Sequence, residues 1–250
     1  MPTETANLND SSPSSFRVAI VVPTYNEAET LPVLIEKVRE QNIDGLGFVI
    51  VDDGSPDGTG EIADGIADEY EGVFIVLHRE GKQGLGSAYR AGFTAALDAG
   101  AELIIEMDAD LSHPPEVLKG LISELESADV AVASRYTEGG GVDPDWSWGR
   151  QQISYWGNVG IRMILGLKVK DATAGFKGFR RKSLETIGID RLRLSGFGFQ
   201  AEVAYRCQKA GLRIVEHPYV FMERTAGKSK MSFGIVVEAF FHLSWLRIRG

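Results

Sequence analysis

The segment VAIVVPTYNE, residues 18–27, joins an uninterrupted apolar run to a polar cluster. Val18 to Val22 carry no polar side chain, which is typical of a strand buried on both faces, as in a parallel sheet. Tyr25, Asn26 and Glu27 then stand at the carboxyl end of this strand, where open parallel sheets bind their ligands.

Four more apolar runs follow, at residues 48–51, 73–77, 103–107 and 130–133. Between them apolar residues recur at helical spacing, as at Leu31, Leu34, Ile35 and Val38. Strand and helix therefore alternate, and the first 134 residues are predicted to form a doubly wound α/β unit. A chain of 250 residues with 44% hydrophobic content fits one domain with an elaborated end.

Charge is divided unevenly along the chain. Residues 1–134 hold 7 Lys and Arg against 25 Asp and Glu, and residues 135–250 hold 19 against 10, so the net charges are −18 and +9. An acidic half suits metal binding, and a basic half suits phosphate groups or an anionic membrane surface. A basic face that is merely solvated is the alternative.

The single cysteine, Cys207, excludes an intrachain disulfide and favours a reducing compartment. Residues 1–15 are rich in Ser, Thr and Asn, and we expect a disordered tail rather than a signal peptide. No run of about eighteen uncharged apolar residues occurs, so no membrane-spanning helix is predicted. We therefore expect a cytoplasmic protein.

Two more polar clusters follow apolar runs. Asp52 and Asp53 come after the second run, and Asp108 and Asp110 come after the fourth. The ends of parallel strands converge on one crevice, where two carboxylates can hold Mg²⁺ or Mn²⁺ together with diphosphate oxygens. Alternatively, Asp110 or Ser112 caps the next helix, but three converging clusters favour the metal.

The second cluster is suited to binding a nucleoside. Asp53 can accept a hydrogen bond from a nucleobase edge or a ribose. The residues expected beneath the nucleoside are Pro23, Tyr25 and Glu27. The glycines of residues 81–86 resemble the start of a dinucleotide-binding fingerprint, but the third glycine is replaced by Tyr89. We expect no nicotinamide or flavin site.

Basic residues of the second half are candidates for the phosphates. Guanidinium groups fork onto phosphate oxygens and ammonium groups add a compact charge, so both can stabilise a departing diphosphate. The candidates are Arg135, Arg150, Arg224, Lys228 and Lys230. Residues 224–230 include a glycine and are predicted to form a loop that closes over the ligand.

Three motifs together resemble glycosyltransferase family 2, namely VPTYNE at residues 22–27, VDDGSPD at 51–57 and MDADLSHPP at 107–115. Within that family the chain looks like the polyprenol (dolichyl) phosphate mannose synthases, through residues 133–136, 171–176 and 224–230. The resemblance covers about residues 16–235, with the motifs in the family's order.

The resemblance implies a GT-A fold, a GDP-mannose donor, Mg²⁺ or Mn²⁺, a polyprenyl (dolichyl) phosphate acceptor, and inversion at the anomeric carbon. It assigns to nucleotide-sugar binding Pro23, Tyr25, Glu27, Val51, Asp53, Asp108, Ala109, Asp110, Arg135, Arg150, Arg224 and Lys230. The expected catalytic residues are Asp110, Arg135, Arg224 and Lys230. The expected parts are a catalytic domain over 16–231, with a nucleotide and metal half (16–134) and an acceptor half (135–231), and a C-terminal amphipathic helix over 232–250.

One position departs from the resemblance. Many family members carry Gln where this chain has Ser112, two residues after Asp110. A hydroxyl is shorter and a weaker ligand than an amide oxygen, so we expect water to help complete a metal shell of Asp108, Asp110 and Ser112.

A lipid phosphate is already ionised at neutral pH, so its attack on the sugar requires no strong general base. Catalysis is then expected from positioning the reactants and neutralising the departing diphosphate. No Gln-x-x-Arg-Trp motif follows the metal residues, which argues against a processive polysaccharide synthase.

Two stretches, residues 152–167 and 233–248, place apolar and aromatic side chains beside basic ones, as interfacial helices do. A core-packing helix is the alternative, most of all for the first stretch. The expected partners are GDP-mannose, a polyprenyl phosphate and the cytoplasmic face of a membrane, with a membrane-anchoring subunit left open. Nucleic acid is not expected.

Four other functions are considered. A UDP-glucose-dependent polyprenyl phosphate glucosyltransferase and a soluble family 2 enzyme with a hydroxyl acceptor share all these motifs. A nucleotidyltransferase would carry a glycine-rich loop with Arg and Lys after the first strand, which residues 25–27 do not match. A catalytically silent nucleotide-binding or scaffold protein would not need the intact Asp108 and Asp110.

Overall fold

The computed structural model describes residues 16–223, 243, 246 and 247. The strands of its main sheet are β1 (Val18–Thr24), β2 (Leu46–Asp52), β3 (Phe74–His78), β4 (Leu103–Glu106), β5 (Val130–Ser134), β7 (Lys177–Arg180) and β8 (Ile214–Pro218). Their order across the sheet is β3-β2-β1-β4-β7-β5-β8. All neighbours are parallel except β7, which runs antiparallel to both β4 and β5.

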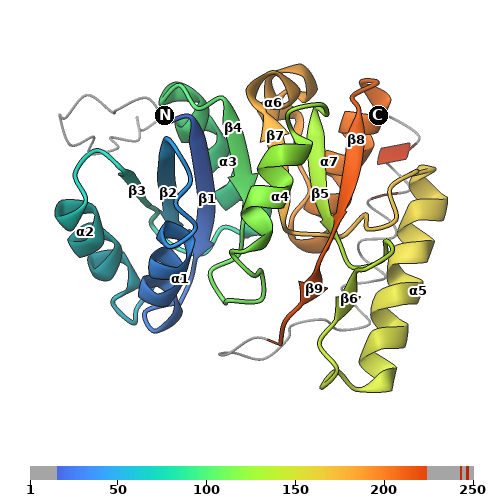
Figure 1. The fold of residues 1–250 in the computed structure, drawn as a ribbon, viewed down its shortest axis with the longest axis horizontal. Helices are drawn as coiled ribbons and strands as arrows, with labels where there is room; N and C mark the ends of the chain where they lie inside the picture. Colours follow the sequence, from blue (N-terminus) through green and yellow to red (C-terminus); the bar gives the residue numbers. More distant parts are fainter. Residues whose placement is uncertain (1–15, 224–242, 244–245, 248–250) are drawn as a thin grey trace.

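Helices cover both faces of this sheet. They are α1 (Thr30–Arg39), α2 (Thr59–Glu69), α3 (Leu85–Asp98), α4 (Val117–Glu124), α5 (Trp148–Leu165), α6 (Arg181–Ile187) and α7 (Gly196–Lys209), with a 3₁₀ turn at Ile189–Arg191. Helices α1, α2 and α4 lie in front of the sheet in Figure 1, and α3, α6 and α7 lie behind it. A short parallel pair, β6 (Gly141–Val142) with β9 (Val220–Phe221), stands beside α5.

The alternation of side chains along β1 explains the two layers of core. Val18, Ile20 and Val22 pack with α1, α2 and α4, whereas Ala19 and Val21 pack with α3 and α7. All five are fully buried, so the run carries no polar face. The predicted α/β class, with a mostly parallel sheet and flanking helices, is confirmed.

Strand β7 was not predicted. Its sequence, Lys-Gly-Phe-Arg, holds one large apolar residue, so it produces no hydrophobic run. It nevertheless lies inside the sheet, between β4 and β5. The Lys177 ammonium lies 3.0 Å from the Glu106 carboxylate of β4, and both side chains are buried. A cation enters the middle of the sheet only because a partner across the strand pair neutralises it.

The first predicted amphipathic stretch is helical and forms most of α5. One end of the helix is anchored in a third apolar cluster, where Leu165 packs near Tyr205, Leu243 and Leu246. The predicted tail, residues 1–15, and most of the predicted C-terminal helix, residues 232–250, lie outside the described residues. No helix among those described is long and apolar enough to cross a bilayer.

Candidate active site

The loops after β1 and β2 interlock at the carboxyl edge of the sheet. Three backbone amides of the first loop donate to side chains of the second: Asn26 to Ser55 at 3.0 Å, Glu27 to Thr59 at 2.9 Å and Ala28 to Asp57 at 3.1 Å. The order of strands changes direction between β1 and β4, so the loop after β1 borders the position where α/β sheets bind ligands, and the loop after β2 is hydrogen-bonded to it. The first two polar clusters are therefore neighbours, as predicted.

The two aspartates of the second cluster have different surroundings. Asp52 accepts hydrogen bonds from the Thr24 hydroxyl at 3.0 Å and from the amide and hydroxyl of Ser55, so it stabilises the loop itself. Asp53 instead faces Arg79, whose Nη1 donates to its Oδ1 at 2.7 Å. Burial raises the pKa of Asp53, and the Arg79 guanidinium opposes that rise. Of the two aspartates, Asp53 is therefore the one that is paired with a guanidinium.

Two basic residues at this edge were missed in the sequence. Arg79 follows β3 and also donates from Nη2 to Gln83 and Ser87. Lys82 places its ammonium 4.2 Å from the centre of the Tyr25 ring. Both belong to the segment from β3 to α3, whose glycines were considered only as a dinucleotide fingerprint. The rule that finds ligand-binding residues after parallel strands would have identified them.

The other predicted nucleotide residues differ in accessibility. Pro23 and Val51 are paired in register on β1 and β2; Pro23 is partly exposed, whereas Val51 is fully buried. A role for Val51 in binding would thus fall to its backbone. The Glu27 carboxylate accepts a 2.6 Å hydrogen bond from Thr30, in the first turn of α1.

The loop after β4 turns back on itself and gathers its polar groups. The amide and hydroxyl of Ser112 donate to Oδ1 of Asp110, at 3.1 and 2.5 Å. Leu111, between them, has φ of +62°, a left-handed conformation that costs energy in a branched residue. The Asp108 amide donates to Nδ1 of His113 at 3.0 Å. These bonds hold Asp108 and Asp110 in one tight turn.

The chemistry of this turn fits a divalent cation. Asp108 and Asp110 are carboxylates, which Mg²⁺ and Mn²⁺ prefer, and they follow a strand at the crevice. Among the described residues no group of three or more His, Cys, Asp or Glu could hold a metal, so other ligands would come from substrate phosphates or water. Ser112 is fully buried against Asp110, and Ala109 is buried as well. The assignments of these residues to metal and diphosphate stay predictions.

Arg135 follows β5 and is paired with a carboxylate. Its Nε and Nη2 fork onto Asp171 at 2.7 and 2.8 Å, and Nη2 also donates to Thr173 at 2.8 Å. Burial lowers the pKa of Arg135, but Asp171 more than offsets this and raises it, so the guanidinium stays charged. Arg135 also lines a cavity of about 190 Å³, together with Tyr136, Ser154 and other residues of β6 and α5.

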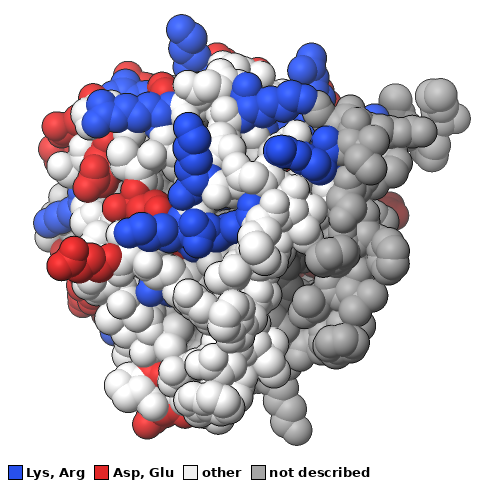
Figure 2. All heavy atoms as spheres, turned by 90° about the vertical axis from the view of Figure 1, so that its right-hand side faces the viewer, with Lys and Arg blue, Asp and Glu red and all other residues white. Residues whose placement is uncertain are grey.

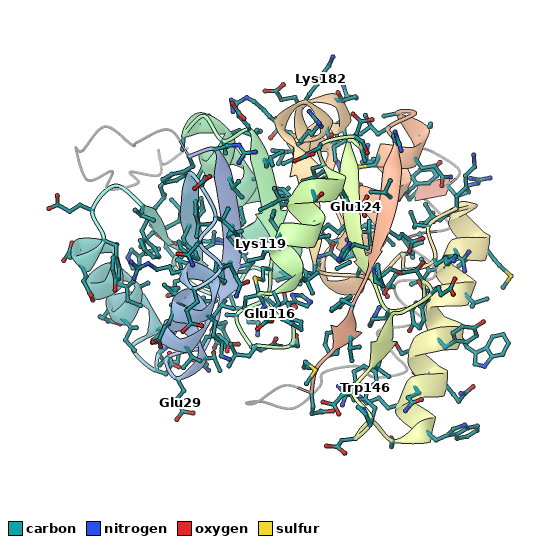
Figure 3. The ribbon with its side chains drawn as sticks, in the orientation of Figure 1. Glu29, Glu116, Lys119, Glu124, Trp146 and Lys182 are labelled. Atoms are coloured by element: carbon teal, nitrogen blue, oxygen red, sulfur yellow. The ribbon has the colours of Figure 1, made fainter. Side chains whose placement is uncertain are left out.

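Arg150 lies in the first turn of α5 and is also engaged. Its Nη1 contacts both carboxylate oxygens of Glu223, at 2.6 and 2.7 Å. Its guanidinium carbon lies 3.7 Å from the centre of the Trp146 ring, which Figure 3 labels beside the start of this helix. The other predicted cations, Arg224, Lys228 and Lys230, lie outside the described residues. The role of all five in phosphate binding stays a prediction.

Comparison with known proteins agrees with this geometry. Residues 19–188 match the family described as glycosyl transferase family 2. Because this match spans more than half of the sequence, the chain belongs to glycosyltransferase family 2. The resemblance drawn from the three motifs is therefore confirmed.

Two curated relatives cover nearly the whole chain. The undecaprenyl-phosphate mannosyltransferase of Micrococcus luteus is 43% identical over 229 residues, which are 92% of this chain and 93% of that protein. The polyprenol monophosphomannose synthase of Mycolicibacterium smegmatis is 41% identical over 235 residues, 94% of this chain and 88% of that protein.

Solved structures share the fold at lower identity. A mannosyltransferase from Pyrobaculum calidifontis, in complex with GDP-Man and Mn²⁺, has a TM-score of 0.64 at 18% identity. The matched region is 97% of this chain and 67% of the mannosyltransferase chain. The glucosyl-3-phosphoglycerate synthase of Mycobacterium tuberculosis has a TM-score of 0.61 at 19% identity, covering 93% and 77%. The expected GT-A fold is confirmed.

Proposed function

We propose that this glycosyltransferase transfers mannose from GDP-mannose to a polyprenyl phosphate, with inversion, giving polyprenyl phosphate mannose and GDP. One observation carries the proposal: Asp53, the Asp108–Asp110 turn and the loop of Arg79 and Lys82 all follow the carboxyl ends of β2, β4 and β3, parallel strands that flank β1 at one edge of the sheet. The names of the two bacterial relatives, each above 40% identity over nearly the full chain, support this donor sugar and this acceptor class.

The described residues divide the work of binding the donor. Asp53 accepts hydrogen bonds from the nucleobase or ribose, and Arg79 holds that carboxylate in place. The Tyr25 ring, with Lys82 above it, offers a flat surface and a positive charge for the nucleotide. Asp108 and Asp110 would hold Mg²⁺ or Mn²⁺, and the cation would supply positive charge to the departing diphosphate.

The reaction needs no proton transfer. An ionised oxygen of the lipid phosphate forms a bond to the anomeric carbon while the bond from that carbon to the diphosphate breaks, and GDP leaves with the electron pair. The protein therefore contributes alignment of donor and acceptor and stabilisation of the departing charge. We propose that the acceptor phosphate binds toward the cavity of Arg135 and Ser154, because a guanidinium and a hydroxyl line this cavity.

A transfer assay tests this function. Purified protein is incubated with Mg²⁺, dispersed polyprenyl phosphate and radiolabelled GDP-mannose or UDP-glucose, and the label extracted into organic solvent is counted. Label from GDP-mannose is expected, and chelating the metal should remove it. Label from UDP-glucose alone would change the donor and keep the acceptor, whereas no lipid label from either donor would overturn the acceptor and favour a soluble family 2 enzyme.

We also propose that α5 binds the surface of a membrane. Trp148, Trp156 and Met163 expose 76%, 62% and 73% of their surface, and Ile153 exposes 59%. Figure 2 faces the side of the molecule that carries α5, where an uncharged area lies below a group of Lys and Arg. Exposed aromatic side chains beside basic ones favour the interface of anionic lipid.

Serine at Trp148, Trp156 and Met163 together should weaken binding to vesicles of phosphatidylcholine and phosphatidylglycerol by at least about a hundredfold, since burial of each side chain in the interface contributes about 1–2 kcal/mol. Vesicle co-sedimentation measures the effect. Val33→Ser, at an exposed apolar residue of α1, is the matched control and should leave binding unchanged. Equal binding by the triple variant and the wild type would remove α5 from the membrane surface.

A further inference from the structure

Tyr89 connects the core of the domain to the metal-binding turn. It lies in the second turn of α3, and its ring stacks against Phe93 and against Phe199 of α7, both at 5.7 Å between ring centres. The side chain is fully buried. Its one polar group, the hydroxyl, lies 3.0 Å from Oδ1 of Asp108, and a phenol beside a carboxylate donates the hydrogen bond.

The surroundings of Asp108 leave its carboxylate little freedom. The hydrogen bond from Tyr89 restrains the side chain, and the bond from the Asp108 amide to His113 restrains the backbone. The His113 ring is itself packed against Phe176, at 4.9 Å between ring centres. Tyr89 contacts a carboxylate oxygen of Asp108 directly, whereas His113 contacts its backbone amide.

Tyr89 also stands on the element that carries the nucleotide loop. Helix α3 begins at Leu85, directly after the segment in which Arg79 contacts Asp53 and Lys82 covers Tyr25. One rigid helix therefore links the base-binding end of the crevice to its metal-binding end. Neither the hydrophobic spacing of α3 nor the glycine pattern before it requires a hydroxyl at residue 89, because phenylalanine would fill the same stack.

We infer that Tyr89 is a positioning residue: its hydroxyl fixes the Asp108 carboxylate in the orientation that binds the metal and, through the metal, the donor diphosphate. This inference rests on the proposed function of the site. Residues that orient a metal ligand through a hydrogen bond typically change metal affinity about 10- to 100-fold when removed. A merely structural tyrosine would instead change stability alone.

The test is Tyr89→Phe, which keeps the stacked ring and removes the hydroxyl. In the presence of GDP, Mn²⁺ binding is titrated by electron paramagnetic resonance, and the Mn²⁺ concentration that gives half-maximal transfer is measured alongside. We expect the dissociation constant for Mn²⁺ and the half-maximal Mn²⁺ concentration to rise about tenfold or more. The midpoint of thermal unfolding should shift by a few degrees at most. Tyr205→Phe, which removes the hydroxyl of another buried tyrosine, on α7, is the matched control and should leave both unchanged.

The outcomes separate the role of Tyr89 from the metal assignment itself. Unchanged Mn²⁺ binding by Tyr89→Phe, with the wild type binding normally, would overturn the positioning role and leave the proposed function intact. No Mn²⁺ binding by the wild type would overturn the metal assignment, and this inference with it. If Tyr89→Phe does not fold, 4-fluorophenylalanine at position 89 keeps the ring and fills the space of the hydroxyl without a donor, and it should weaken Mn²⁺ binding about tenfold; an affinity within about twofold of the wild type would contradict the inference.

Discussion

Replacing Asp110 by Asn is expected to lower the turnover number about a thousandfold, because the proposed metal site would lose one of its two carboxylates and would hold more weakly the cation that neutralises the departing diphosphate. The amide has nearly the same shape, and its oxygen can still accept from Ser112, so the turn should keep its conformation. Initial rates of mannosyl transfer measure the effect, and near-ultraviolet circular dichroism verifies the fold.

Asp64→Asn is the control for the loss of one negative charge. Asp64 lies on α2 and contacts His78, with about half of its side chain exposed, and it is far in sequence from the turn proposed to bind the metal. It should retain full activity. An Asp110→Asn protein that keeps more than about a tenth of the wild-type rate would remove this residue from the metal site.

Replacing Asp171 by Ala is expected to lower the free energy of unfolding by about 3–5 kcal/mol. Asp171 is fully buried and accepts hydrogen bonds from Nε, Nη2 and the backbone amide of Arg135. Without it a buried guanidinium remains with no counter-charge, which is the costly case. Urea denaturation followed by tryptophan fluorescence measures the change.

Glu185→Ala is the contrasting variant, because it breaks the Arg181–Glu185 pair, whose side chains are 38% and 51% exposed. That change should stay within about 0.5 kcal/mol, as is usual for exposed ion pairs. A comparable, small loss in Asp171→Ala would mean that the Arg135 pair contributes little to the stability of the fold.

The same pair sets a dependence on pH. Burial raises the pKa of Asp171, but the charge and hydrogen bonds of Arg135 outweigh burial, so the pKa lies below its usual value. A carboxyl with a lowered pKa in the folded state stabilises the fold above its unfolded pKa of about 3.9, and this contribution is lost as the pH falls through the folded value. The difference between wild type and Asp171→Ala should therefore shrink below about pH 4.

Much of the site could be predicted because its residues follow buried strands. The apolar runs before Tyr25, Asp53 and Asp108 identify strands by composition, and the carboxyl ends of parallel strands meet whatever the rest of the fold does. The same rule applied to the third run would have found Arg79 and Lys82. The run at residues 73–77 was predicted correctly, but the residues after it were not considered as ligand-binding candidates.

By itself, the sequence determined the α/β class, the family, the strands with continuous apolar runs and the position of Asp53, Asp108 and Asp110 directly after parallel strands, because those depend on local periodicity and on chain order. Only the tertiary structure decided the place of β7 between β4 and β5, the Lys177–Glu106 and Arg135–Asp171 pairs, and the hydrogen bond from Tyr89 to Asp108. The physical reason is that a buried charge or hydroxyl has no favourable position until a partner distant in the sequence is brought to it, and no local pattern specifies that partner.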